Sequence, residues 1–528
     1  MKRNPSLTPL AVLLLGAGCH CTHTSSPGII EAARNLPGRG SVQASAAEIP
    51  RAPVPAQVSA TSASGGAVSI SVGAPVATDA ALHPLMLGVI SGPDPAASVA
   101  RGADLTEGYQ QIGVVSVRNN DYYDDRLDFA GILDCGAATA PSWDGCDPAK
   151  DSSYRWEASD RQYQSYLDGG FIPFLRLGDE WQNPSRPHAF ASPKNRQQED
   201  ALVEAARRIT ARYKSWPAHP RAFEYLDIWT EFPGQHFWSG NPAAFAPFWI
   251  RMYQALDAEH PELKIGGPGF AMPQTMQVLQ GRRGTLAEQF LSALYSSKIQ
   301  PDWFGWHIFS SSPQEYARAA ANYQDLLDGR GAFAHVPWAG SGFFRGTEVI
   351  VDAYGLGARD PTDHSRVGRP PDEEKAALLT AGWIALQYAD VKGAFYYRGN
   401  DQGQARGAGG LSGLFTFDGQ KKKSAEAFAL WSRITRGYPA LLSTSLPVDG
   451  ATQTVWALAA RNPSGAVALL VANTADSPVT IQVGAKGLSG TGAVRVYRVD
   501  ASHDGTTAST ADPAGIALAA NGVALIEL

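Results

Sequence analysis

The sequence predicts an α/β protein, a (β/α)8 TIM barrel followed by a C-terminal β-sandwich. From His83 onward, short apolar strands alternate with longer amphipathic helices, as in a barrel with inserted loops. After Leu430 the chain continues as short strands separated by turn residues, without a long helix. A doubly wound sheet is a poorer match, because the segment GVISGPDP after the first strand is not a glycine-rich phosphate loop.

Eight short apolar runs are the expected barrel strands. Clear amphipathic helices lie between them, among them residues 199–216 and 313–329. The expected strands are residues 85–92, 112–121, 171–181, 225–232, 263–270, 302–310, 334–342 and 391–401. The barrel then covers residues 83–433 and the sandwich residues 434–528, while residues 67–82 form an early strand that could join the sandwich.

The N-terminus predicts export. Lys2 and Arg3 precede a short apolar run, Leu10 to Gly18, which is too short to span a membrane. Residues 1–21 therefore form a signal region, and Cys19 fits the lipidated cysteine of a bacterial lipoprotein. Residues 22–66 are a low-complexity tether. We expect a periplasmic or cell-surface lipoprotein that meets the membrane only through this anchor, with plain secretion as the alternative.

Composition excludes several classes of partner. The net charge of −6 provides no basic stripe for nucleic acid or an anionic membrane surface. No cofactor and no metal are expected, because the sequence shows no nucleotide loop and no cluster of metal ligands. Cys135 and Cys146 close a short loop, and in an exported chain a disulfide is the leading interpretation.

The predicted strand ends carry aromatic, basic and acidic side chains, and in such barrels the chemistry occurs at the carboxyl ends of the strands. Tryptophan rings match the apolar face of a sugar, so the set fits a poly- or oligosaccharide site. Each member also has a plain structural interpretation, such as a salt bridge or a buried histidine. The candidate substrate-binding residues are Arg118, Asp121, Trp181, Trp229, His307, Trp338, Tyr397, Arg398 and Asp401.

The segment YLDIWTEFPG ends a predicted strand on Glu231, between Trp229 and Phe232. Glycoside hydrolysis uses two carboxyl groups, one of which protonates the leaving oxygen. An apolar surrounding disfavours the charged form of a carboxyl and suits that role. Glu231 is therefore the candidate general acid/base, and a salt bridge to an arginine is the alternative.

In this order, the segments resemble glycoside hydrolase family 39, a clan A group that includes β-xylosidases, α-iduronidases and bacterial exopolysaccharide hydrolases. The resemblance covers about residues 85–528 and rests on motifs such as FIPFLRLGDEW, IWTEFPG, WHIFSSSPQEY and FYYRGND. It implies that Glu231 is the acid/base, with Thr230 where the family has an asparagine that holds the sugar 2-hydroxyl. The family's nucleophilic glutamate would fall on Pro337, which cannot serve.

Three interpretations of this departure follow. The protein is a hydrolase that uses another carboxylate, with Glu180, Glu348 and Asp401 as candidates in that order. Alternatively, it is a non-catalytic carbohydrate-binding barrel. In the third interpretation, the seventh strand is assigned to the wrong residues, and Glu348 in the following loop lies closer to Glu231 than the assignment implies.

Overall fold

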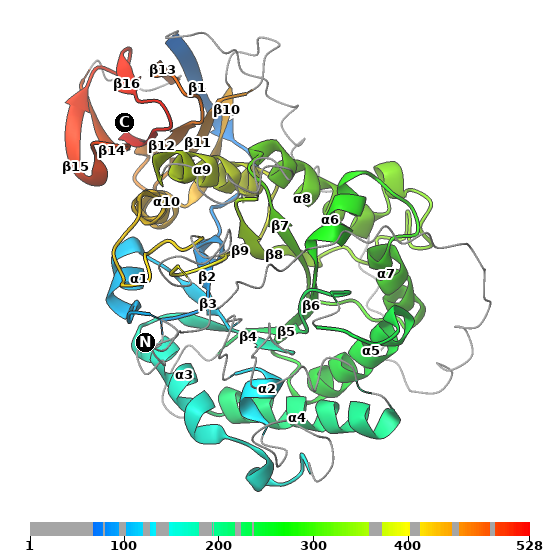
Figure 1. Cartoon of the computed structure of the whole chain (residues 1–528). Helices are drawn as coiled ribbons and strands as arrows, with labels where there is room; N and C mark the ends of the chain where they lie inside the picture. Colours follow the sequence, from blue (N-terminus) through cyan, green and yellow to red (C-terminus); the bar gives the residue numbers. More distant parts are fainter. Residues whose placement is uncertain are drawn as a thin grey trace, which may run out of the picture. The chain divides into compact units, whose positions relative to one another are not determined.

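Eight parallel strands close into a barrel, and each strand pairs with its neighbours in chain order (Figure 1). The barrel strands are β2 (Gly88–Ile90), β3 (Ser116–Arg118), β4 (Ile172–Leu177), β5 (Tyr225–Ile228), β6 (Lys264–Phe270), β7 (Trp303–Phe309), β8 (Glu348–Gly355) and β9 (Gly393–Tyr396). The computed structural model describes residues 67–77, 80–93, 102–119, 127–133, 147–178, 193, 195–216, 223–234, 237–357, 372–401, 412–445, 453–485 and 492–528.

Helices follow the strands and surround the barrel. They are α1 (Thr106–Ile112), α2 (Phe129–Ile132), α3 (Trp156–Asp168), α4 (Arg196–Lys214), α5 (Pro242–Glu259), α6 (Met272–Leu279), α7 (Leu286–Ser296), α8 (Pro313–Asp328), α9 (Asp372–Tyr388) and α10 (Lys423–Gly437). Short 3-10 turns are η1 (Pro84–Met86), η2 (Asp151–Ser153) and η3 (Gly331–Phe333). The side chains of Asn195, Asn241 and Thr285 each accept a hydrogen bond from the first turn of the following helix, which fixes where α4, α5 and α7 begin.

The seventh barrel strand differs from the prediction. Residues 334–347 form turns, and the strand is β8, Glu348–Gly355. Pro337 and Trp338 therefore do not close a strand. The run EVIVDAYG has the β-branched composition of a buried strand, whereas the segment around Pro337 contains proline and glycine, which interrupt strand pairing.

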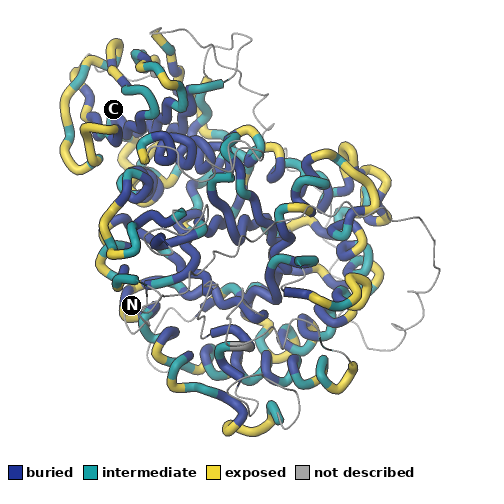
Figure 2. The backbone as a smooth tube through the Cα atoms, in the orientation of Figure 1, coloured by how far each residue is buried: buried dark blue, intermediate teal, exposed yellow. Residues whose placement is uncertain are grey.

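The barrel strands are mostly buried (Figure 2), and their inward side chains form layers. Phe174 on β4 contacts Trp303 on β7 and Phe395 on β9, with ring centroids 5.1 and 4.4 Å apart. These strands are not neighbours in the barrel, so the rings meet across its interior. Side chains alternate with period two along a strand, so the next inward position lies one layer closer to the carboxyl ends. That next layer is charged, as described below.

A second sheet contains the C-terminal strands and the early strand β1 (Ala67–Pro75), in the order β15-β14-β17-β12-β11-β10-β1-β13-β16. Its other strands are β10 (Ala440–Ser445), β11 (Val455–Arg461), β12 (Val467–Asn473), β13 (Val479–Ala485), β14 (Val494–Val499), β15 (Asp504–Ala511), β16 (Ile516–Leu518) and β17 (Val523–Glu527). β1 pairs with β10 and β13. The predicted barrel and C-terminal β-sandwich are thus confirmed.

Strand β11 shows how the sandwich joins the barrel. Val455 and Ala457 belong to the sandwich core, while the alternate residues Trp456 and Leu458 belong to the main core with the barrel helices. The strand is therefore buried on both faces. Tyr388 at the end of α9 adds a hydrogen bond from its hydroxyl to the Leu442 carbonyl, at 2.9 Å.

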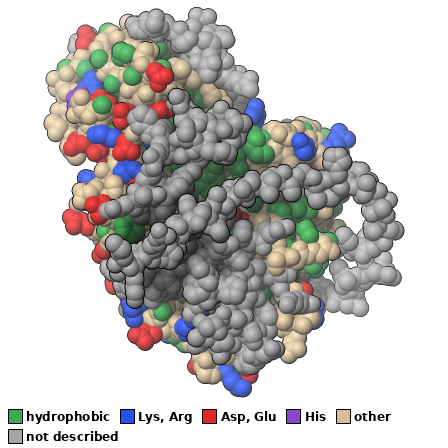
Figure 3. All heavy atoms as spheres, viewed as in Figure 1, with side chains coloured by type: hydrophobic (Ala, Val, Ile, Leu, Met, Phe, Trp, Pro, Cys, Tyr) green, Lys and Arg blue, Asp and Glu red, His purple; other side chains and the backbone are tan. Residues whose placement is uncertain are grey.

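On the face shown in Figure 3, acidic and basic side chains of the described residues are interspersed. None of the described helices combines the length and hydrophobicity that a membrane-spanning helix requires.

Candidate active site

Glu231 follows β5 in a turn with unusual backbone geometry. Trp229 and Glu231 have φ angles of 81° and 48°, in the left-handed region that residues other than glycine rarely adopt. Such conformations persist where the surrounding structure fixes them, and they concentrate at functional sites. The turn leaves the Glu231 side chain 21% exposed, which makes it accessible from the carboxyl end of the barrel.

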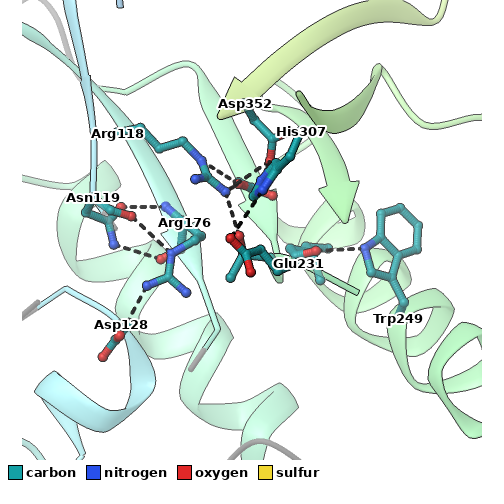
Figure 4. A network of polar contacts seen from close by, with 11 residues as sticks. Arg118, Asn119, Asp128, Arg176, Glu231, Trp249, His307 and Asp352 are labelled. Atoms are coloured by element: carbon teal, nitrogen blue, oxygen red, sulfur yellow. Dashed lines mark hydrogen bonds and ion pairs between the residues drawn. The ribbon is translucent and has the colours of Figure 1, made fainter. Parts of the chain in front are cut away.

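Trp229 is placed differently from the prediction. Its indole is fully buried against Phe129, Trp238 and Phe248, and its Nε1 donates to the Phe237 carbonyl at 3.0 Å. The ring is therefore part of the aromatic core and does not face the barrel mouth. Trp249 donates from α5 to the Ile228 carbonyl at 3.0 Å and holds the same strand end (Figure 4).

Arg118 on β3 organises the charged layer inside the barrel. Its Nε and Nη2 donate to Asp227 Oδ2 at 2.9 and 2.6 Å, and Nη2 also donates to Asp352 Oδ2 at 3.0 Å. A longer bond of 3.2 Å reaches the Thr230 hydroxyl. Arg118, Asp227 and Asp352 have no exposed side-chain surface. The arginine thus serves this buried network and is not an exposed substrate contact.

His307 links the layer to Glu231. Its Nδ1 lies 3.4 Å from Glu231 Oε1, and its Nε2 lies 3.5 Å from Asp352 Oδ2. The ring is 1% exposed and stands between the two carboxylates (Figure 4). Both carboxylates therefore lie beside one imidazole and belong to one site.

A glycine makes room for this arrangement. Gly269 on β6 has a φ of +61°, and a Cβ there would collide with Asp352 Oδ2 and lie 3.1 Å from His307 Nε2. A side chain at this position would therefore displace the pair. The glycine-rich strand KIGGPGF supplies backbone where a side chain would fill the site.

Burial and neighbouring charges shift the pKa values of Asp352, Asp227 and His307. Burial opposes ionisation of Asp352, but the charges of His307 and Arg118 outweigh it and lower the pKa of Asp352. Burial and the Asp352 charge raise the pKa of Asp227 to about 7, against the effect of Arg118. Burial disfavours charge on His307, yet Asp352 and Glu231 raise its pKa to about 9. Asp352 is therefore the carboxylate of the layer that is held ionised.

A second buried network joins β3 to β4. Arg176 donates from its backbone N–H to the Asn119 side chain at 2.6 Å and from Nε to the Asn119 carbonyl at 3.0 Å. Its Nη2 reaches Asp128 at 3.1 Å, and Asp128 also caps α2. This network fixes the strand ends that flank the charged layer (Figure 4).

Several predicted residues have partners other than Glu231 and its network. Glu348 begins β8, at the amino end of the barrel, where it pairs with Lys264 at 2.6 Å and accepts from Tyr225. Trp338 is buried in the helical shell and donates to the Leu326 carbonyl at 2.9 Å. Asp401 binds Lys422 at 3.0 Å and accepts from the Gly413 N–H at 2.9 Å. The prediction that Glu348 lies near the site is thus wrong. Glu348 is the first residue of a parallel strand, so it lies at the amino end of the barrel, opposite the carboxyl ends of the strands.

The end of β9 carries the remaining predicted residues. The Tyr397 ring contacts Phe309 edge-on, with centroids 6.0 Å apart. Arg398 is 4% exposed and donates to Asn400 at 3.3 Å. Asp121, Glu180, Trp181 and the three cysteines Cys19, Cys135 and Cys146 lie outside the described residues.

The prediction missed Asp227 and Asp352, although the sequence contains a signal for both. Asp227 comes two residues after Tyr225, and Asp352 two residues after Ile350, both of which pack against the barrel's inner apolar cluster. Period two therefore places each aspartate one layer closer to the barrel mouth. Within the described residues, no group of His, Cys, Asp and Glu is arranged to hold a metal ion.

Comparison with known proteins shows the fold. No protein-family model matches the sequence, and no curated protein matches it either. Among solved structures, a glucosidase from Croceicoccus marinus superimposes with a TM-score of 0.64 at 21% identity, over 87% of this chain and 98% of that chain.

Two further solved structures are similar at lower identity. A monomeric β-xylosidase from Caulobacter crescentus CB15 has a TM-score of 0.57 at 17% identity, covering 88% of this chain and 99% of that one. A glycoside hydrolase family 39 enzyme from Xanthomonas axonopodis pv. citri has a TM-score of 0.57 at 17% identity, covering 88% and 97%. The chain therefore has a family 39-like fold.

Proposed function

We propose that this protein is an exported glycoside hydrolase acting on a poly- or oligosaccharide, with Glu231 as general acid/base and Asp352 as the second carboxylate. One observation carries the proposal: a carboxylate from the turn after β5 and one from within β8 lie beside the two nitrogens of the same imidazole, that of His307. The likeness of the fold to a glucosidase and a β-xylosidase supports the same reaction class.

Glu231 suits the proton-transfer role because its side chain is reachable while its backbone is fixed by the turn. The protonated carboxyl would give its proton to the glycosidic oxygen as the bond to the anomeric carbon breaks. Glu231 then becomes the base that accepts a proton from water.

Asp352 suits the second role because His307 and Arg118 keep its pKa low and its carboxylate charged. An ionised carboxylate can stabilise the positive charge that develops on the sugar ring, or attack the anomeric carbon. Direct attack requires roughly 5–5.5 Å between the carboxyl groups, and activation of a water requires roughly 6.5–9.5 Å. The configuration of the newly formed product anomer, read by proton NMR, distinguishes the two.

A carbohydrate-binding barrel without turnover is the second candidate, and one observation favours it. Asp352 has no exposed surface, so a sugar reaches it only if the site opens. Such a protein would bind oligosaccharide in a calorimeter and release no reducing ends over days.

The substitution Glu231→Gln tests the proposal, since it preserves shape and removes the transferable proton. We expect hydrolysis to fall by about 10²–10⁴-fold while oligosaccharide binding in the calorimeter is kept. Unchanged hydrolysis in this variant would exclude Glu231 as the acid/base.

A further inference from the structure

Each nitrogen of His307 faces a carboxylate, Glu231 on one side and Asp352 on the other. We propose that His307 is a fixed imidazolium, a positioning residue that holds both carboxylates and does not itself transfer a proton. The role of His307 as a positioning residue rests on the proposed function. Its protonation state is argued from the geometry and charge of the layer alone.

Nε2 has no hydrogen-bond partner among the described residues, so the contacts of the ring with the two carboxylates are ion-pair contacts. A neutral imidazole carries one N–H and one lone pair, whereas an imidazolium donates from both nitrogens. With Nδ1 at 3.4 Å from Glu231 and Nε2 at 3.5 Å from Asp352, a neutral ring would direct its lone pair at a carboxylate oxygen. The doubly protonated ring carries a positive charge and presents an N–H on the side of each carboxylate, so it attracts both.

The charge of the buried layer leads to the same state. When both aspartates are ionised, Asp227 and Asp352 supply two negative charges and Arg118 supplies one positive charge, all without exposed surface. A protonated His307 makes the layer neutral, whereas a neutral one leaves an uncompensated buried charge, which is costly. Tyr323 of α8 contributes no charge, because burial raises its pKa and its hydroxyl bonds Thr275.

A proton on Asp227 is the rival way to neutralise the layer. Arg118 donates twice to Asp227 Oδ2, which favours the charged form of this carboxyl. A neutral His307 beside a protonated Asp227 would also lose the charge attraction between the ring and the carboxylates of Glu231 and Asp352. The geometry therefore favours the proton on His307.

A permanently charged His307 also determines which group of the site transfers protons. A ring that stays charged through neutral pH releases no proton during turnover, so Glu231 is the proton-transfer group beside it. The ring keeps Asp352 ionised and fixes the direction of the Glu231 side chain.

Nitrogen NMR of the whole chain with ¹⁵N-labelled histidine tests this assignment without any turnover. His307→Gln identifies the ring signals, and His335→Gln is the matched control, since His335 is 29% exposed and pairs with Glu288 elsewhere. We expect both His307 nitrogens to show imidazolium shifts at pH 7.5, with a titration midpoint near 9. Asp352→Asn should lower that midpoint by roughly 1–3 pH units.

A neutral-tautomer signal for His307 at pH 7.5 would overturn the proposal. If His307→Gln does not fold, the shift of the Nδ1 signal in Glu231→Gln identifies the ring instead, because Glu231 is partly exposed. A charged His307 in a protein that hydrolyses no glycan would refute the proposed function and leave this assignment standing.

Discussion

Among the individual residues, Asp352 is a carboxylate whose side chain has no exposed surface. A fully buried carboxylate is stable as an anion only when charged partners compensate the lost hydration. Arg118 at 3.0 Å and His307 at 3.5 Å provide those partners. Asp352 is thus held as a buried anion, whereas the carboxyl group of Glu231, on the other side of His307, is reached by solvent.

The raised pKa of His307 makes stability depend on pH. Its pKa rises from 6.5 to about 9 on folding, so its contribution is fully present below pH 6.5 and is lost as the pH rises through 9. Full loss corresponds to about 3 kcal/mol. Urea unfolding between pH 6 and 10 should show this decline in the wild type and not in His307→Gln. Parallel curves for the two proteins would contradict the shift.

Gly269 provides a steric test of the charged layer. Gly269→Ala should destabilise the protein by about 1–3 kcal/mol more than Gly284→Ala, because crowding adds to backbone strain. The control is matched, since Gly284 has a φ of +69° and no atom lies within 4 Å of its added Cβ. Urea unfolding measures both variants, and equal losses would mean that Asp352 does not need this space.

Among the elements, the strands and helices follow from periodicity, while the site does not. Alternation of apolar strands and helices predicts the barrel correctly, including Tyr225–Ile228 ending just before Glu231. The seventh strand is predicted wrongly because the short apolar run at residues 334–342 contains proline and glycine and folds as turns. Asp352 was missed because a charged residue inside an apolar run looks like an interruption, and only the partners Arg118 and His307, distant in sequence, explain it.

The loop between Cys135 and Cys146 is predicted to be closed by a disulfide. A disulfide closing it would stabilise the protein by roughly 3 kcal/mol in the chain-entropy model. Non-reducing peptide mass spectrometry of protein from an exporting host should find the linked pair. Free thiols at both positions would refute it.

For the whole molecule, the N-terminal sequence predicts export with lipid attached at Cys19. In a bacterial host, the processed protein should fractionate with membranes, and Cys19→Ser should release it. Globomycin should block the processing. A wild-type mature protein that begins beyond Cys21 and carries no lipid would leave export in place and exclude the lipoprotein.

The barrel as a whole brings together Glu231 and Asp352, which are distant in the sequence. A comparison of Asp352 with Glu348, both on β8, shows that the position along a strand decides the surroundings of a carboxylate. Asp352 lies beside His307 toward the carboxyl end, and Glu348 lies with Lys264 at the amino end. Carboxylates of one strand thus have different surroundings, and only Asp352 lies in the layer beside His307.

The most direct measurement is the rate of reducing-end release by the wild type, Asp352→Asn and Glu348→Gln on one oligosaccharide. The account predicts turnover by the wild type, a loss of at least about 10²-fold in Asp352→Asn, and a change of no more than a few-fold in Glu348→Gln. Full activity in Asp352→Asn, or no release by the wild type over days, would contradict it.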